Sequence, residues 1–221
     1  MAPSITLWFL QASRSIRIAW LLEELHQDYN LKFFDRMSNM KAPDEFKSGC
    51  GNALGKAPSL QDGDVTVFES GAITEYLCEK YDEENRLMPR DAKERVKVLQ
   101  WIHASEATFM LHALAITYAR WNVPAHCKDN GDLAAMEKGM SANVQNDLEW
   151  LESELSASKG GFLCGDKVTA ADTMMQFSLE FIMGTNLGTQ GKEWPAINKW
   201  LEKCRACEGY RKAVEKTGHR L

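Results

Sequence analysis

The chain has 221 residues, of which 44% are hydrophobic and 26% charged, and its formal net charge is −5. This length is enough to bury a substantial core in one or two domains. The acidic balance and the scattered basic residues exclude the class of nucleic-acid-binding proteins with a strongly basic surface. No apolar stretch reaches the roughly 18 residues of a transmembrane segment, so no membrane-spanning helix is expected.

The six cysteines are too few and too scattered for a disulfide-dense secreted scaffold. The N-terminus has no basic region before its apolar segment and no clear cleavage site, so we expect a first strand there rather than a signal peptide. Both observations favour a cytoplasmic protein with reduced thiols. Cys204 and Cys207 form a C-x-x-C pair, but no second pair completes a zinc site and the motif lies in a predicted helix, so we assign it a structural role.

The chain begins with the order strand, helix, strand. Residues 5–10 are a continuous apolar run of strand length, which is typical of a strand buried on both faces. After a break at 11–15, a wide apolar stripe over 16–25 predicts a helix, and residues 31–35 predict a second, shorter strand. Such a unit requires a parallel strand pair and a right-handed crossover.

A hairpin and a helix follow in the stretch ALGKAPSLQDGDVTVFESGAITEYL. Strands predicted over 57–60 and 65–68 flank an Asp-Gly turn, which tolerates positive φ. A helix begins at Glu69-Ser70, because apolar residues then recur at helical spacing. The hairpin adds an antiparallel edge, so we expect a small mixed sheet covered by helices.

Two features of this stretch each allow two interpretations. About 5–6% of X–Pro bonds in folded proteins are cis, so the residues alone favour a trans bond before Pro58; a cis bond would turn the amide and carbonyl of Ala57 outward. Ser70 either caps its own helix, with Glu69 near the positive end of the dipole, or binds a ligand carboxylate while Glu69 binds an ammonium. The second pairing suits an α-amino acid.

The composition changes at residues 82–91, which are charged and contain a proline, as is typical of a linker. From residue 92 the pattern is helical almost throughout, with helices predicted over four ranges: 98–116, 131–158, 170–183 and, as a shorter pair, 197–214. Thr169 and Asp172 have the spacing of a capping box, which is a structural device. The sequence therefore predicts an α+β domain followed by an all-α domain.

The segment NALGKAP, the Glu69-Ser70 pair with its Ile-x-x-Tyr-Leu helix, and GDKVTAAD at 165–172 resemble motifs of the glutathione S-transferase family. The resemblance spans essentially the whole chain and is to serine-type members, both theta/phi-like and fungal or bacterial. It implies a thioredoxin-like glutathione-binding domain over 1–81, a linker over 82–91, and an all-helical domain over 92–221 that carries most of a hydrophobic substrate pocket.

The resemblance also implies roles in binding the cosubstrate glutathione. In the family, the residue before a cis-proline pairs its backbone with the cysteinyl part of glutathione, and a Glu/Gln-Ser pair holds the γ-glutamyl end. These roles fall on Ala57, Pro58, Glu69 and Ser70. The glycine carboxylate needs cations, for which the candidates are Lys41 and Lys56. The loop before Asn52 is a residue or two longer than is usual in the family, and Ala53 replaces a common proline.

The family places its thiolate-stabilising donor, a Tyr, Ser or Cys, in the turn between the first strand and the first helix. No tyrosine or cysteine occurs that early here, which leaves Ser13 and Ser15. Serine-type members show a Ser-x-x-x-Arg pattern, which fits Ser13 as the donor and Arg17 four residues later. Ser13 is also a natural N-cap, so Ser15 is the second choice, and Arg14 is a weaker candidate for adding positive potential.

The acceptor pocket is expected between the domains, with walls from the first long helix of the second domain. Its candidates are by default core or interface residues, of which only some can line a pocket, and are Phe109, His112, Ala113, Ile116 and Tyr118. The resemblance thus implies a glutathione transferase that conjugates glutathione to small hydrophobic electrophiles. It also implies a homodimer, with Phe46 and the long helix that begins near Lys93 as possible contacts. The alternatives are a glutathione-dependent peroxidase or isomerase of the same fold, and a non-catalytic glutathione-binding regulatory protein. No metal is expected.

Overall fold

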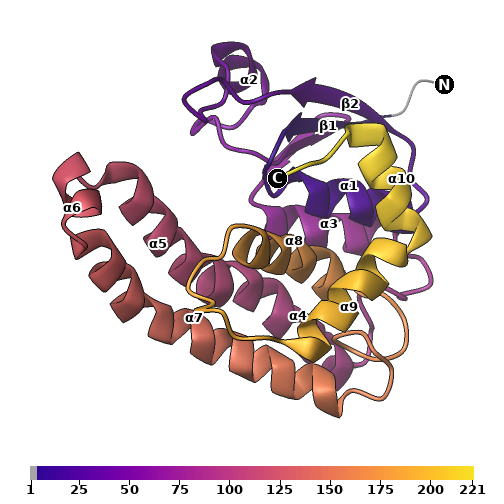
Figure 1. Cartoon of the computed structure of the whole chain (residues 1–221). Helices are drawn as coiled ribbons and strands as arrows, with labels where there is room; N and C mark the ends of the chain where they lie inside the picture. Colours follow the sequence, from indigo (N-terminus) through magenta and orange to yellow (C-terminus); the bar gives the residue numbers. More distant parts are fainter. Residues whose placement is uncertain (1–3) are drawn as a thin grey trace. The chain divides into compact units, whose positions relative to one another are not determined.

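The computed structural model describes residues 4–221, and the chain divides into two compact units. The first unit contains the chain up to Val98 together with Cys204–Leu221, and the second contains Leu99–Lys203. Figure 1 shows the strands in the first unit and the helices α5 to α8 in the second.

The first unit is built on a four-stranded sheet in the order β2-β1-β3-β4. Its strands are β1 (Ile5–Leu10), β2 (Tyr29–Phe34), β3 (Ser59–Asp62) and β4 (Val65–Phe68). β1 and β2 are parallel, whereas β3 is antiparallel to both β1 and β4. The predicted mixed sheet is therefore confirmed, and it matches the thioredoxin-like arrangement that the resemblance implied.

β3 begins at Ser59, later than the predicted start at Ala57. The Ala57–Pro58 peptide bond is cis, so the trans bond that the residues alone favoured is wrong. Proline also has no N–H with which to join a ladder. Ser59 is the first residue to pair, opposite Trp8 on one side and Phe68 on the other.

Helix α1 is the centre of the first unit's core. The helices of this unit are α1 (Ser15–Glu24), α2 (Asp44–Gly49), α3 (Ser70–Tyr81), the start of α4 (Ala92–Ala104), the end of α9 (Pro195–Ala206) and α10 (Glu208–Thr217). Every residue of α1 from Ile16 to Leu22 is at most 1% exposed. It packs on β1, α3 and α10, and Figure 1 shows α10 running beside it. Such a helix has no solvent face, which is why its apolar stripe is so wide.

The structure differs from the predicted domains at the C-terminus, where Cys204–Leu221 groups with the first unit. The physical reason is the contact of α10 with α1, which brings together segments that no local pattern connects. Within the same unit, Phe46 is fully buried and packs edge-on against Trp8 and Phe34, with ring centroids 6.2 and 5.5 Å away. It belongs to the unit's own core, so the prediction of Phe46 as a dimer contact is wrong.

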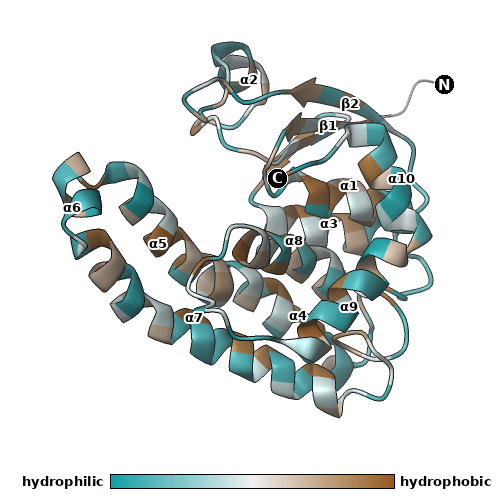
Figure 2. Ribbon diagram, in the orientation of Figure 1, coloured by the Kyte–Doolittle hydropathy of each residue, from teal (hydrophilic) through white to brown (hydrophobic). Residues whose placement is uncertain are grey.

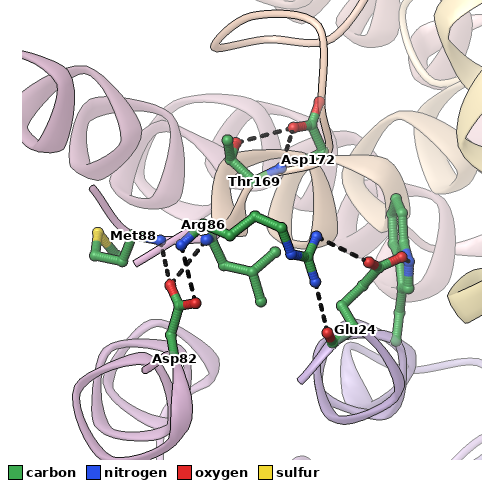
Figure 3. A network of polar contacts seen from close by, with 8 residues as sticks. Glu24, Asp82, Arg86, Met88, Thr169 and Asp172 are labelled. Atoms are coloured by element: carbon green, nitrogen blue, oxygen red, sulfur yellow. Dashed lines mark hydrogen bonds and ion pairs between the residues drawn. The ribbon is translucent and has the colours of Figure 1, made fainter. Parts of the chain in front are cut away.

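The predicted linker forms an ordered turn in the first unit. The Asp82 carboxylate accepts hydrogen bonds from the backbone N–H groups of Arg86, Leu87 and Met88 at 2.8–3.0 Å. The Arg86 guanidinium donates to the carboxylate and the carbonyl oxygen of Glu24, at 3.2 and 2.6 Å (Figure 3). This turn therefore fixes the C-terminal end of α1.

The second unit is helical. It contains the end of α4, a π-helical segment η1 (Ser105–Met110), α5 (Leu111–Asn122), α6 (Ala125–Asp129), α7 (Asp132–Ala157), α8 (Ala170–Gly184) and the start of α9 (Pro195–Ala206). The predicted long helix is thus interrupted at η1, where the Ser178 hydroxyl donates to the Ser105 carbonyl at 3.0 Å. An i→i+5 turn leaves a carbonyl in need of another partner, and Ser178 supplies it.

Helix α8 is the buried helix of the second unit, and Figure 2 shows hydrophobic brown segments along it. The predicted capping box at its start is confirmed: the Asp172 carboxylate accepts from the Thr169 N–H at 2.9 Å (Figure 3). The same carboxylate also accepts from the Leu163 N–H and the Trp200 indole, each at 3.0 Å. Asp172 therefore joins three segments of the unit as well as capping a helix.

Candidate functional site

The turn that follows β1 holds the predicted thiolate donors. Ser13 is 6% exposed, and its hydroxyl donates to the Leu10 carbonyl at 2.6 Å while its oxygen accepts from the Ser15 N–H at 3.1 Å. The hydroxyl oxygens of Ser13 and Ser15 lie 2.9 Å apart, and Ser15 is fully buried. Because a hydroxyl proton rotates freely, Ser13 can donate to a ligand by giving up the Leu10 carbonyl. Ser13 is better placed than Ser15 for such a contact.

Arg17 links the first helix to the second predicted binding segment. It lies in the first turn of α1, is 1% exposed, and donates from Nη1 to the Ser70 hydroxyl oxygen at 3.0 Å. Ser70 is the first residue of α3. Since its oxygen is the acceptor here, the Ser70 hydroxyl keeps its own proton to donate to an anion. Arg17 therefore acts on Ser70, a contact that the Ser-x-x-x-Arg pattern did not predict.

Glu69 precedes α3 in a strained conformation. Its φ is 73° and its ψ 116°, outside the regions that residues with a side chain normally adopt. Its carbonyl accepts the Ile73 N–H at 2.9 Å, whereas its side chain makes no capping hydrogen bond and is exposed. Strain of this kind costs on the order of 1–3 kcal/mol and clusters at ligand-binding positions. The Ser70 hydroxyl oxygen accepts from Arg17 and makes no capping hydrogen bond in the part of the chain that the structure describes, so the interpretation of Ser70 as the cap of its own helix is not supported; the Glu69 carboxylate faces solvent.

Ala57 has an open backbone position. Pro58 is buried and Ala57 half-buried, and within residues 4–221 neither the N–H nor the carbonyl of Ala57 has a hydrogen-bond partner. Backbone polar groups in folded proteins are nearly always paired or solvated. A ligand in extended conformation can use both groups as the next strand of a sheet would.

The loop before Ala57 is organised by Asn52, which is 4% exposed. Its side-chain oxygen accepts the Leu54 N–H at 2.9 Å, and its amide donates to the Lys56 carbonyl at 3.3 Å. The backbone at Lys56 is therefore held while its ammonium stays exposed, and Lys41 is exposed as well. Both lysines remain predictions for binding a carboxylate.

The acceptor-pocket candidates of the helical unit divide into two groups. Phe109, Ala113 and Ile116 are fully buried, so they are core residues that offer no wall to a ligand in this structure. His112 is partly exposed, and its Nδ1 lies 2.6 Å from the Asp147 carboxylate. Burial raises the pKa of Asp147, although the hydrogen bond from His112 opposes that effect.

The exposed apolar side chains of α5 lie on another face of the helix. They are Leu111, Tyr118 and Trp121, which are 59%, 51% and 59% exposed, and the two aromatic rings meet edge-on at 5.9 Å. Of the predicted wall, only Tyr118 belongs to this face. Sequence reasoning missed Leu111 and Trp121, because the apolar stripe that identifies the helix marks the buried face.

Sequence reasoning also missed Gln11 and Arg36, which touch the turn before Ser13. Arg36 donates to the carbonyls of Gln11 and Ala12, at 2.9 and 3.0 Å. The sequence order could have indicated this contact. The carboxyl ends of two parallel strands meet at one edge of a sheet, and Arg36 follows β2 as Gln11 follows β1.

No helix within residues 4–221 has the length and apolar character needed to cross a bilayer.

The comparisons with known proteins agree on one family. The profile of the glutathione S-transferase N-terminal domain matches residues 3–79, and that of the C-terminal domain matches residues 114–208. Glutathione S-transferase 3 of Schizosaccharomyces pombe is 31% identical over 223 residues, which cover 96% of this chain and 87% of that protein.

Solved structures give the same result. A glutathione S-transferase from Actinobacillus pleuropneumoniae superposes with a TM-score of 0.78 at 31% identity, covering 98% of this chain and 94% of its own. A glutathione transferase from Phanerochaete chrysosporium, solved in complex with oxidized glutathione, has a TM-score of 0.74 at 26% identity and covers 98% of this chain and 97% of its own. On these matches and on the sheet and helical units described above, the chain belongs to the glutathione S-transferase family.

Proposed function

We propose that this protein is a glutathione transferase that conjugates glutathione to small hydrophobic electrophiles, with Ser13 stabilising the thiolate. In the reaction, the glutathione thiol loses its proton to solvent, and the sulfur attacks an electrophilic carbon. A carbon–sulfur bond forms, and the leaving group departs with its electron pair. Family membership and the complex of the Phanerochaete chrysosporium relative with oxidized glutathione support glutathione as the cosubstrate.

The observation that carries the proposal is the hydrogen bond from Arg17 to Ser70. It joins the first turn of α1 to the first residue of α3, so the N-terminal ends of two helices lie close together. Each helix start carries a partial positive charge and unpaired N–H groups, which favour anions. Glutathione offers two matching anions, its thiolate and its γ-glutamyl carboxylate.

Each end of the tripeptide then has a partner in this unit. The γ-glutamyl carboxylate binds the Ser70 hydroxyl and the start of α3, and the strained, exposed Glu69 binds the ammonium. The cysteinyl backbone pairs with the open N–H and carbonyl of Ala57. Lys41 and Lys56 supply positive charge for the glycine carboxylate.

Ser13 supplies the step that makes the sulfur reactive. A free thiol has a pKa of about 8.5, so only a few per cent is ionised at neutral pH. Donation from the Ser13 hydroxyl and the partial charge at the start of α1 both favour the thiolate and lower the pKa of the thiol. Arg14, the residue that precedes α1, adds positive potential.

The test is the conjugation rate of a chloronitroarene by Ser13→Ala, with Ser15→Ala and the exposed Ser48→Ala as matched variants. Loss of the main donor to the developing anion lowers turnover on the order of 10²-fold. Ser48→Ala is expected to behave as the wild type. Near-normal turnover of Ser13→Ala with loss in Ser15→Ala would reassign the donor, and absence of glutathione binding by the wild type would refute the function.

The apolar face of α5 supports a hydrophobic acceptor. Leu111, Tyr118 and Trp121 expose aliphatic and aromatic surface there, which suits apolar electrophiles. The homodimer and the cytoplasmic location stay predictions; all six cysteines are free, which fits a reducing compartment.

A further inference from the structure

We propose that Arg36 and the C-terminal tail, residues 218–220, form a clamp that positions Ser13. The clamp acts on Gln11 and Ala12, the two residues between β1 and the serine. This inference rests on the proposed role of Ser13 and adds positioning residues to it. All of its parts lie in the first unit.

Arg36 forms the first arm of the clamp. Its Nε donates to the Gln11 carbonyl at 2.9 Å, its Nη2 to the Ala12 carbonyl at 3.0 Å, and its Nη1 to the Met40 carbonyl at 2.7 Å. One planar guanidinium thus holds both carbonyls of the turn and a third from the next loop, a geometry that a lysine cannot reproduce. Burial, and after it the charge of Arg14, lowers the pKa of Arg36.

The C-terminal tail forms the second arm through the Gln11 side chain, which is 5% exposed. Gln11 Nε2 donates to the Gly218 carbonyl at 2.7 Å, and Gln11 Oε1 accepts the Arg220 N–H at 3.1 Å. The same oxygen accepts the Ala12 N–H at 3.0 Å. The Arg220 guanidinium also binds the Asp35 carboxylate at 3.1 Å. The packing of α10 on α1 therefore delivers the end of the chain to the turn.

The turn needs this support because of its backbone. Ala12 has a φ of 50°, in the left-handed region that costs a residue with a side chain roughly 1–2 kcal/mol. Carbonyls bound to Arg36 cannot at the same time rotate toward Ser13 and present their negative ends to a thiolate. Release of the clamp allows the Ala12 peptide to relax and moves the Ser13 hydroxyl, and a displacement of about 1 Å can cost up to 10²-fold in rate.

The test compares Arg36→Lys with Arg120→Lys. Arg120 is a matched control because its guanidinium also donates to two backbone carbonyls, those of Thr185 and Asn186, but within the helical unit. The readouts are the pKa of the bound glutathione thiol, followed by the ultraviolet absorbance of the thiolate, the Kd of glutathione, and kcat. For Arg36→Lys we expect a thiol pKa higher by about one unit and a tenfold lower kcat at neutral pH, with the Kd unchanged. Arg120→Lys keeps the wild-type thiol pKa.

A deletion of residues 219–221 tests the second arm and leaves α10 and its Gly218 cap in place. For this deletion we expect a smaller rise in the thiol pKa, again with unchanged Kd. If Arg36→Lys does not fold, the deletion and Gln11→Leu together test whether the clamp positions Ser13. A wild-type thiol pKa in these clamp variants, alongside a raised one in Ser13→Ala, would overturn the clamp. A Ser13→Ala variant with a wild-type thiol pKa would instead refute the proposed donor. Loss of glutathione binding in step with kcat would show a merely structural role and also overturn the clamp.

Discussion

Asp62 makes the acid stability of this protein predictable. It lies at the end of β3 with its side chain 2% exposed, and its carboxylate accepts hydrogen bonds from four groups: Ser4 Oγ at 3.1 Å, Tyr76 OH at 3.0 Å, Lys80 Nζ at 2.7 Å and Tyr81 OH at 2.5 Å. Burial by itself raises the pKa of Asp62, but these hydrogen bonds outweigh burial and lower the pKa from 3.8 to about 2.

The magnitude follows from linkage between protonation and folding. A carboxyl group whose pKa is lower in the folded than in the unfolded state stabilises the fold above the unfolded pKa and loses that contribution as the pH falls through the folded pKa. The lowering of the Asp62 pKa by nearly two units corresponds to about 2 kcal/mol. That part of the unfolding free energy should disappear between about pH 4 and pH 2.

The assay is urea unfolding of the wild type and of Asp62→Asn at a series of pH values. The wild type should lose about 2 kcal/mol more than the variant across that acid range. Asp44→Asn is the matched control, because Asp44 also pairs with a lysine, Lys47, but is 95% exposed and so contributes little. If the wild type and Asp62→Asn lose stability in parallel from pH 4 to pH 2, the reasoning from the buried network is refuted.

Two further predictions concern the binding segment and the helical unit. Arg17→Met should raise the Kd of glutathione about tenfold or more, because a buried hydrogen bond from a charged group contributes roughly 1.5–3 kcal/mol to the placement of Ser70. Calorimetric titration measures this Kd, and an unchanged Kd would show that Ser70 needs no support from Arg17. Thr169→Ala should lower the unfolding free energy by about 0.5–2 kcal/mol through loss of a helix cap, without changing conjugation kinetics. Urea unfolding measures this free energy, and a fall in the kcat of the folded variant would contradict a purely structural cap.

Local patterns predicted the elements of this fold well. The hairpin, the buried first strand and the Thr169–Asp172 capping box each depend on residues a few positions apart, and each is present, although the hairpin turn falls on Gly63-Asp64 because Asp62 still pairs with Val65 in the ladder. The π-helical segment η1 was missed, since one extra residue per turn over six residues leaves the apolar periodicity almost unchanged. The buried position of Phe46 was missed as well, because its partners Trp8 and Phe34 lie on strands distant in sequence.

The site shows the same division between local and distant information. The positions of Ser13 and Ser70 at two helix starts could be predicted from neighbouring residues. The hydrogen bond that connects these two helix starts could not be predicted, because Arg17 and Ser70 are 53 positions apart. The contact of the C-terminal tail with Gln11 could not be predicted either, since Gly218 lies 207 residues away from Gln11.

Helix α1 explains why such distant contacts are needed. A rotation of this helix by a single residue, about 100°, would carry both the serines at its start and Arg17 away from their partners. Its orientation therefore governs the proposed sulfur site and the proposed amino-acid site together. Its C-terminal end is held against rotation. Trp20 Nε1 donates to the Glu24 carboxylate at 3.0 Å, and Arg86 binds the same carboxylate (Figure 3). The Trp20 ring also packs edge-on against Tyr210 of α10 at 5.2 Å. Helix α1 is thus fixed at its C-terminal end by contacts far from the proposed sulfur site, and at its first turn by the hydrogen bond from Arg17 to Ser70.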